Sequence, residues 1–150
     1  MAQTTTYQRQ RLSQSSLLDE KIDKITEALP ASYANKLKAS QQISIETVTT
    51  IIDYIAAMKS EINLSDHYRK DLIEVLTRFS KYLDYKPFKD LTRDNIIAFL
   101  DTFRRPEAID PQYKWIGTYN VYRIHLMRFF KWLYAPDIEH TKREKPKCYS

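Results

Sequence analysis

Glycine is almost absent from this sequence: Gly117 is the only one among 150 residues. Tight turns between β-strands usually need positive φ angles, which glycine adopts at little cost. A chain with one glycine is therefore poorly suited to β-hairpins, and it has no glycine-rich loop that could hold a phosphate. We expect an all-α protein whose helices are joined by loops containing serine, asparagine and proline.

Cysteine and long apolar runs are equally scarce. The single cysteine, Cys148, cannot form an internal disulfide, which is typical of a reducing compartment. No run of 18 apolar residues occurs, and the first ten residues, MAQTTTYQRQ, lack the apolar centre of a signal peptide. We therefore expect a soluble cytoplasmic protein that does not contact a membrane.

The side chains that could hold a metal ion are scattered along the chain. The three histidines, His67, His125 and His140, do not have the spacing of a metal site. His140 and Cys148 lack the paired ligands of a zinc motif. We expect no metal and no other cofactor.

Positive charge is concentrated near the end of the chain. Residues 1–111 contain 16 basic and 16 acidic side chains, whereas residues 112–150 contain 8 basic and 3 acidic ones. This asymmetry favours an anionic partner, with nucleic acid ahead of a membrane surface. A net charge of +5 by itself fits equally well with a role in solubility alone.

Hydrophobic periodicity predicts six helices separated by polar or proline-containing segments. Ser44, Ser65 and Thr92 are the expected N-caps of three of them, and Pro30 and Pro136 are expected to end two others. Residues 1–14 are rich in Gln, Thr and Ser, and we expect them to form a disordered arm. The predicted helices span residues 15–29, 31–39, 44–60, 66–83, 92–104 and 115–134.

The last of these helices combines an aromatic face with a polar face. Its sequence is WIGTYNVYRIHLMRFFKWLY. At about 100° per residue, one face collects apolar residues that must be buried, and the opposite face collects Asn120, Ile124, Arg128 and Lys131, with Arg123 at its border. The apolar face comprises Tyr119, Tyr122, Leu126, Phe129, Phe130 and Leu133.

Three stretches in this order resemble the core-binding domain of the tyrosine recombinases, the phage integrase family, and archaeal integrases in particular. They are IIDYIAAMKSEINLSDHYRKDL, FKDLTRDNIIAFLDTF and GTYNVYRIHLMRFFKWLYAPD, and together they cover residues 51–137. The resemblance implies a compact orthogonal, SAM-like bundle of four to five helices over residues 44–137. Residues 1–43 would be an N-terminal arm and helical extension, and residues 138–150 a basic interdomain linker.

The same resemblance implies that the chain is half of a clamp around double-stranded DNA during integration or recombination, associated with the nucleoid. A separate C-terminal catalytic domain would be its partner, and a homo-oligomer, a tetramer on DNA, is possible in this family. The helices at 66–83 and 117–134 would approach the DNA. The implied DNA-binding residues, together with flanking basic residues, are Arg69, Lys70, Lys81, Lys114, Thr118, Asn120, Arg123, Arg128, Lys131, Lys142 and Arg143.

A set of residues here mimics the catalytic motif of that family. His125 and Arg128 form an H-x-x-R pattern, and Tyr149 follows as a candidate nucleophile. The second arginine motif is absent, and no catalytic domain fits after residue 137. We therefore expect that this chain is not an enzyme by itself.

Two other interpretations remain. The chain is alternatively a helical protein-interaction module, in which residues 1–43 exchange onto a neighbouring subunit and the basic residues serve solubility. A helix-turn-helix regulator would need a short tight turn between two helices, to which the loops are poorly suited.

Overall fold

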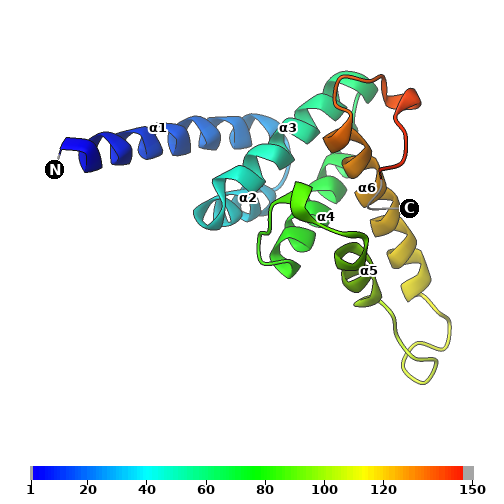
Figure 1. The fold of residues 1–150 in the computed structure, drawn as a ribbon. Helices are drawn as coiled ribbons and strands as arrows, with labels where there is room; N and C mark the ends of the chain where they lie inside the picture. Colours follow the sequence, from blue (N-terminus) through cyan, green and yellow to red (C-terminus); the bar gives the residue numbers. More distant parts are fainter. Residues whose placement is uncertain (1, 147–150) are drawn as a thin grey trace. The chain divides into compact units, whose positions relative to one another are not determined.

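The computed structural model describes residues 2–146, and Cys148 and Tyr149 therefore lie outside the described residues. Within this part of the chain the regular structure is entirely helical, which confirms the all-α prediction (Figure 1). The α-helices are α1 (Ala2–Ile25), α2 (Ala31–Ile43), α3 (Ile45–Ile62), α4 (Asp66–Tyr82), α5 (Arg93–Asp101) and α6 (Trp115–Tyr134). Two short 3₁₀-helices, η1 (Phe88–Asp90) and η2 (His140–Lys142), complete them.

The chain forms two compact units, residues 1–77 and 78–150. The division falls inside α4, so this helix contributes its first three turns to one unit and its last turn to the other. Helices α1 and α2 pack against α3 within the first unit, across the boundary that the sequence suggests between residues 43 and 44.

Helix α1 is longer than its sequence suggests. We expected a disordered arm over residues 1–14, and this expectation is wrong, because α1 is helical from Ala2 to Ile25. The early residues have no apolar stripe, but they contain neither Gly nor Pro to interrupt a helix. Further along, Leu18, Ile22 and Ile25 are buried and hold α1 in the first unit.

The predicted N-caps are confirmed. The Ser44 hydroxyl accepts a hydrogen bond from the Thr47 backbone N–H at 3.2 Å, at the start of α3. Ser65 accepts one from the Tyr68 N–H at 3.2 Å before α4. At α5, Thr92 and Asn95 form a reciprocal capping box. Caps of this kind each stabilise a helix by about 1 kcal/mol, so they fix where these helices begin.

An aromatic core fills the second unit. The Phe79 ring meets Phe99 edge-on, with ring centroids 5.1 Å apart, and Phe130 at 6.1 Å. Phe88 packs against Phe129 at 4.8 Å. These contacts join the end of α4, η1, α5 and one face of α6. The buried aromatic face of α6 therefore determines which of its other residues face outward.

Candidate nucleic-acid interface

Helix α6 has two chemically different faces, as its periodicity predicts. Tyr122, Leu126, Phe129 and Phe130 are buried. On the other side a row of polar and cationic side chains is exposed or half-buried, and the helix contains no acidic residue at all. Asn120, Arg123 and Arg128 are exposed, and Lys131 is half-buried.

The exposed face of α6 is not purely polar. Ile116, Val121, Ile124 and Tyr134 are also exposed, with Val121 at 47% and Ile124 at 36% of their full accessible surface. These apolar side chains alternate with Asn120 and Arg123 along the helix. Such a mixture suits a partner that offers both negative charge and apolar groups.

The two residues of the H-x-x-R pattern lie in different environments. His125 is 7% exposed, whereas Arg128 is exposed on the outer face. His125 therefore belongs to the buried side of α6. Its neighbours Leu126 and Phe129 are fully buried, and the imidazole extends that buried face.

Arg69, expected among the DNA-facing residues, points into the first unit instead. It is only 6% exposed. One guanidinium nitrogen donates to the backbone oxygens of Ile25 and Glu27, at 2.8 and 3.1 Å, and the other donates to the Asp66 carboxylate. These carbonyls lie at the last residue of α1 and just past it, so Arg69 closes that helix end and has no surface left for a phosphate. Its neighbour Lys70 is half-buried.

Arg143, expected in a flexible basic linker, is likewise buried. It is 5% exposed, and its guanidinium donates to the backbone oxygens of Ala135 at 2.9 Å and Pro136 at 3.2 Å. The carbonyls at the end of α6 have no partners within the helix, and Arg143 supplies the donors that they need. It thereby folds residues 138–146 back along the end of α6.

This folded-back segment forms one wall of a groove in the second unit. The groove has a volume of about 810 Å³ and is lined by Leu91, Thr92, Tyr134 and Ile138 together with charged residues from both walls. Three of these are cationic, Arg93 at the start of α5 and Lys142 and Lys145 on the C-terminal segment, and one is acidic, Glu144. The start of a helix adds partial positive charge, so the groove favours an anion.

The remaining candidates are all exposed. Lys114 and Thr118 lie at the start of α6, and Lys81 lies in the last turn of α4. The structure thus places Thr118, Asn120, Arg123, Arg128 and Lys131 on α6, with Lys114 as its N-cap residue, and Lys142 in the same groove as Arg93.

Sequence reasoning missed several cations of the second unit. Arg93 and Lys145 line the groove, and no short motif links them, because about fifty residues separate them in the chain. The guanidinium carbon of Arg104 lies 5.3 Å from the Trp115 ring and 5.5 Å from the Tyr119 ring. A hydrogen bond to Asp101, aided by its charge, raises the pKa of Arg104, a cation beside the start of α6.

No group of three His, Cys, Asp or Glu side chains in the described part of the chain is placed to hold a metal ion. None of its helices is both long and apolar enough to cross a membrane. Protein-family models, curated proteins and solved structures give no match to this chain. The function proposed below therefore rests on the charge and geometry of the second unit.

Proposed function

We propose that this chain binds double-stranded DNA through the outer face of α6 and the basic groove beside it. The observation that carries the proposal is the absence of any acidic residue from the 20 residues of α6, whose outer face bears Arg123, Arg128 and Lys131. The surrounding unit, residues 78–150, has 15 basic and 9 acidic side chains, whereas residues 1–77 have 9 and 10. Duplex DNA is a dense row of negative charges that such a surface attracts.

The mixed composition of α6 gives each kind of side chain a role. Arginine and lysine contact phosphates and position the helix, while contacts to base edges provide sequence preference. Asn120 can pair with adenine, and Arg123 with guanine, through two hydrogen bonds each. Val121 and Ile124 offer apolar contact to the thymine methyl group, which explains why apolar side chains are exposed beside the cations.

The resemblance of residues 51–137 to tyrosine recombinases extends this proposal. The chain would be the core-binding domain of a site-specific recombinase or integrase, forming half of a clamp on the duplex. Cleavage and rejoining would belong to a catalytic domain of the full-length protein. In this role the chain positions DNA and performs no chemistry.

A salt titration tests the proposal directly. We expect the affinity for a duplex, measured by fluorescence anisotropy, to fall with salt at a log–log slope of roughly −0.9 per phosphate contacted. Arg123→Ala and Lys131→Ala should each weaken binding. Where a phosphate contact is lost, the log–log slope should become less steep by about 0.9.

The control is Lys59→Ala, which removes the same charge from an exposed position on α3. It should leave both affinity and slope unchanged. If all three variants bind like the unchanged chain, α6 is not the DNA surface.

A second candidate function rests on a different observation. Four large apolar side chains on α1 and at the end of α2 are strongly exposed, namely Tyr7, Leu12, Leu17 and Ile43. They favour a helical protein-interaction module that associates with another subunit. Sizing at low and high salt, with and without DNA, distinguishes the two: a stable oligomer that ignores DNA supports the interaction module, and a monomer that shifts only with DNA supports the first proposal.

A further inference from the structure

A groove of about 540 Å³ in the first unit is lined by residues of α1 and α3. We call it the lysine groove, because its charged lining consists of three lysines and a single aspartate. The lysines are Lys21, Lys24 and Lys59, and the apolar part of the lining is Ile25, Ile52 and Ala56. None of these residues belongs to the proposed DNA surface.

The three lysines are exposed, and none of them has a carboxylate partner within the described part of the chain. Two other lysines of the same unit are paired, Lys36 with Glu74 and Lys38 with Asp23. The first unit as a whole has a net charge of −1. The lysine groove is therefore a local concentration of free positive charge that can attract an anionic partner.

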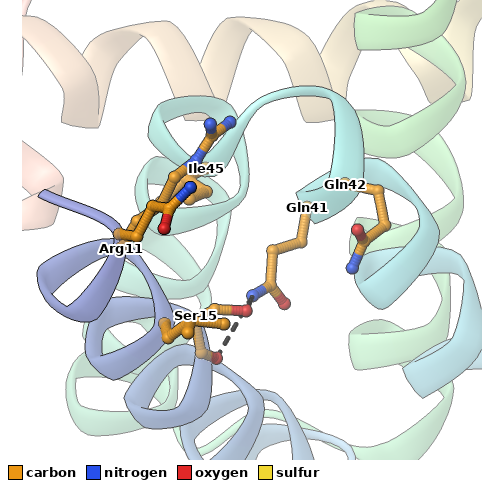
Figure 2. A pocket seen from close by; sticks show the side chains of 7 residues that line it. Arg11, Ser15, Gln41, Gln42 and Ile45 are labelled. Atoms are coloured by element: carbon orange, nitrogen blue, oxygen red, sulfur yellow. Dashed lines mark hydrogen bonds between the residues drawn. The ribbon is translucent and has the colours of Figure 1, made fainter. Parts of the chain in front are cut away.

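A second pocket of the first unit, of about 440 Å³, has a different character (Figure 2). Arg11 is the only charged residue of its lining. The amide nitrogen of Gln41 donates to the backbone oxygen of Ser15 at 3.2 Å and to the Ser15 hydroxyl at 2.9 Å, as the dashed lines in Figure 2 show. These bonds tie α2 to α1, so this pocket serves the fold, and we look for a partner at the lysine groove.

The loop between α5 and α6 has the opposite charge. Its tip, residues 106–111 with the sequence PEAIDP, contains two acidic residues and no basic one, in a unit whose net charge is +6. Ile109 is 72% exposed, and the exposed Glu107 has no ion-pair partner among the residues described. An apolar side chain between carboxylates is poorly suited to DNA phosphates. It suits a groove that offers both lysines and an apolar lining.

The loop tip has a fixed shape. The backbone N–H groups of Ile109 and Asp110 both donate to the carbonyl of Pro106 at 3.0 Å. The Asp110 carboxylate accepts a hydrogen bond from the Trp115 N–H at 3.0 Å, which joins the tip to the start of α6. The loop extends beyond the ends of α5 and α6 (Figure 1). A preformed loop loses little conformational freedom when it docks, which favours its use as a contact.

The two arginines that precede the tip have other partners. Arg104 pairs with Asp101 at 2.7 Å. Arg105 donates to the backbone oxygens of Thr102 and Arg104, at 2.8 and 2.9 Å. Neither arginine forms an ion pair with Glu107, whose negative charge remains available.

We propose that the loop tip of one chain docks into the lysine groove of a second copy of the chain. Ile109 enters the apolar part of the groove, and Glu107 pairs with the lysines around it. An apolar centre with a charged rim is the usual arrangement of a protein interface. The loop and the groove lie in different units, so the contact joins two unlike surfaces of the chain.

One loop tip in one groove buries a small area, so this association is weak and transient. Dilute chains therefore stay apart on a sizing column and in anisotropy measurements, where Lys59→Ala remains a control for DNA binding. The contact goes beyond the two functions proposed above, because it uses neither the outer face of α6 nor the exposed apolar residues of α1.

Sedimentation velocity of the full chain without DNA, at increasing chain concentration, tests the proposal. The sedimentation coefficient of the unchanged chain should rise with concentration, and less so at high salt. Ile109→Ser, Glu107→Lys and the double substitution Lys21→Glu, Lys24→Glu should each weaken the association by about tenfold or more. The matched control, Lys86→Glu with Lys89→Glu, makes the same change of charge at exposed positions outside both surfaces and should leave the association unchanged.

Mixing two variants tests the pairing of loop with groove. A chain with Ile109→Ser keeps an intact groove, and a chain with Lys21→Glu and Lys24→Glu keeps an intact loop. Each variant alone should stay monomeric, whereas an equimolar mixture should form dimers through the one intact contact. A mixture that stays monomeric would overturn the proposal. Circular dichroism checks the folding of the groove variant; if it unfolds, an unchanged association of Ile109→Ser overturns the proposal by itself.

Two other results would also contradict it. The first is an unchanged chain that stays monomeric up to its solubility limit. The second is an association that is weakened by reversing Lys142 and Lys145 and not by reversing Lys21 and Lys24, because the loop would then dock in the groove of the second unit. All these measurements are made without DNA, so their failure leaves the proposed DNA binding untouched.

Discussion

At the scale of single residues, two arginines serve the fold and not the surface. Arg69 and Arg143 both direct their guanidinium groups at backbone carbonyls near helix ends. Arginine has five N–H donors in a planar group, so one side chain can satisfy several carbonyls at once. Their positive charge in the sequence therefore overstates the charge that is available to DNA.

Removing Arg69 should destabilise the protein without a direct effect on DNA. Arg69→Ala leaves the carbonyls of Ile25 and Glu27 without their donor, and we expect the free energy of unfolding to fall by about 2–3 kcal/mol. Urea denaturation measures this change. Lys59→Ala, at an exposed position, should stay within about 0.5 kcal/mol of the unchanged chain. An equal effect of both substitutions would contradict the structural role of Arg69.

The only glycine is in a place that does not need one. Gly117 lies in the first turn of α6, its φ angle is not positive, and an added Cβ would meet no atom within 4 Å. Gly117→Ala should therefore stabilise the protein by about 0.5–1 kcal/mol, because alanine loses less backbone entropy in a helix. Thermal denaturation should show a higher Tm.

A matched substitution tests the same reasoning at a left-handed position. Ala28 has a φ angle of 66°, which alanine adopts at a cost and glycine does not. Ala28→Gly should consequently raise the stability by up to about 1 kcal/mol, although alanine to glycine is usually destabilising. A loss of stability in both variants would show that neither backbone position behaves as described.

At the scale of elements, the C-terminal segment depends on one side chain. Arg143→Ala removes the donors that hold residues 138–146 against the end of α6, and amide hydrogen exchange in this segment should become faster. Lys142→Ala, at the neighbouring exposed position, should leave exchange unchanged and weaken DNA binding by itself. If Lys142→Ala and not Arg143→Ala made exchange faster, Arg143 would not be the residue that holds this segment.

The elements themselves were largely predictable from the sequence. Ser44, Ser65 and Thr92 marked helix starts because capping is a local interaction, and the apolar spacing of residues 115–134 marked α6 in full. The start of α1 was missed because its first turns have no apolar stripe. The burial of Arg69 could not be foreseen, because its carbonyl partners lie 44 and 42 residues away in the chain. Arg93 and Lys142, which line the same groove, are likewise far apart in the chain.

At the scale of the whole molecule, the charge is divided between the two units. Residues 1–77 have a net charge of −1 and residues 78–150 a net charge of +6. On addition of a short duplex, we expect NMR chemical-shift changes in α6, the start of α5 and residues 138–146, and little change in α1 to α3. Higher salt should reverse these chemical-shift changes. Chemical-shift changes spread evenly over both units would contradict the proposed surface.

The position of the unit boundary inside α4 has a practical consequence for the design of truncated fragments. No loop separates Thr77 from Arg78, so a fragment that ends there would lose the last turn of its final helix. The complementary fragment would begin one residue before Phe79, whose ring packs on Phe88, Phe99 and Phe130, with no preceding turn to hold it in place. Limited proteolysis should accordingly spare this boundary and cut first in the exposed loop between α5 and α6, and expression of either half alone should give insoluble or unfolded protein.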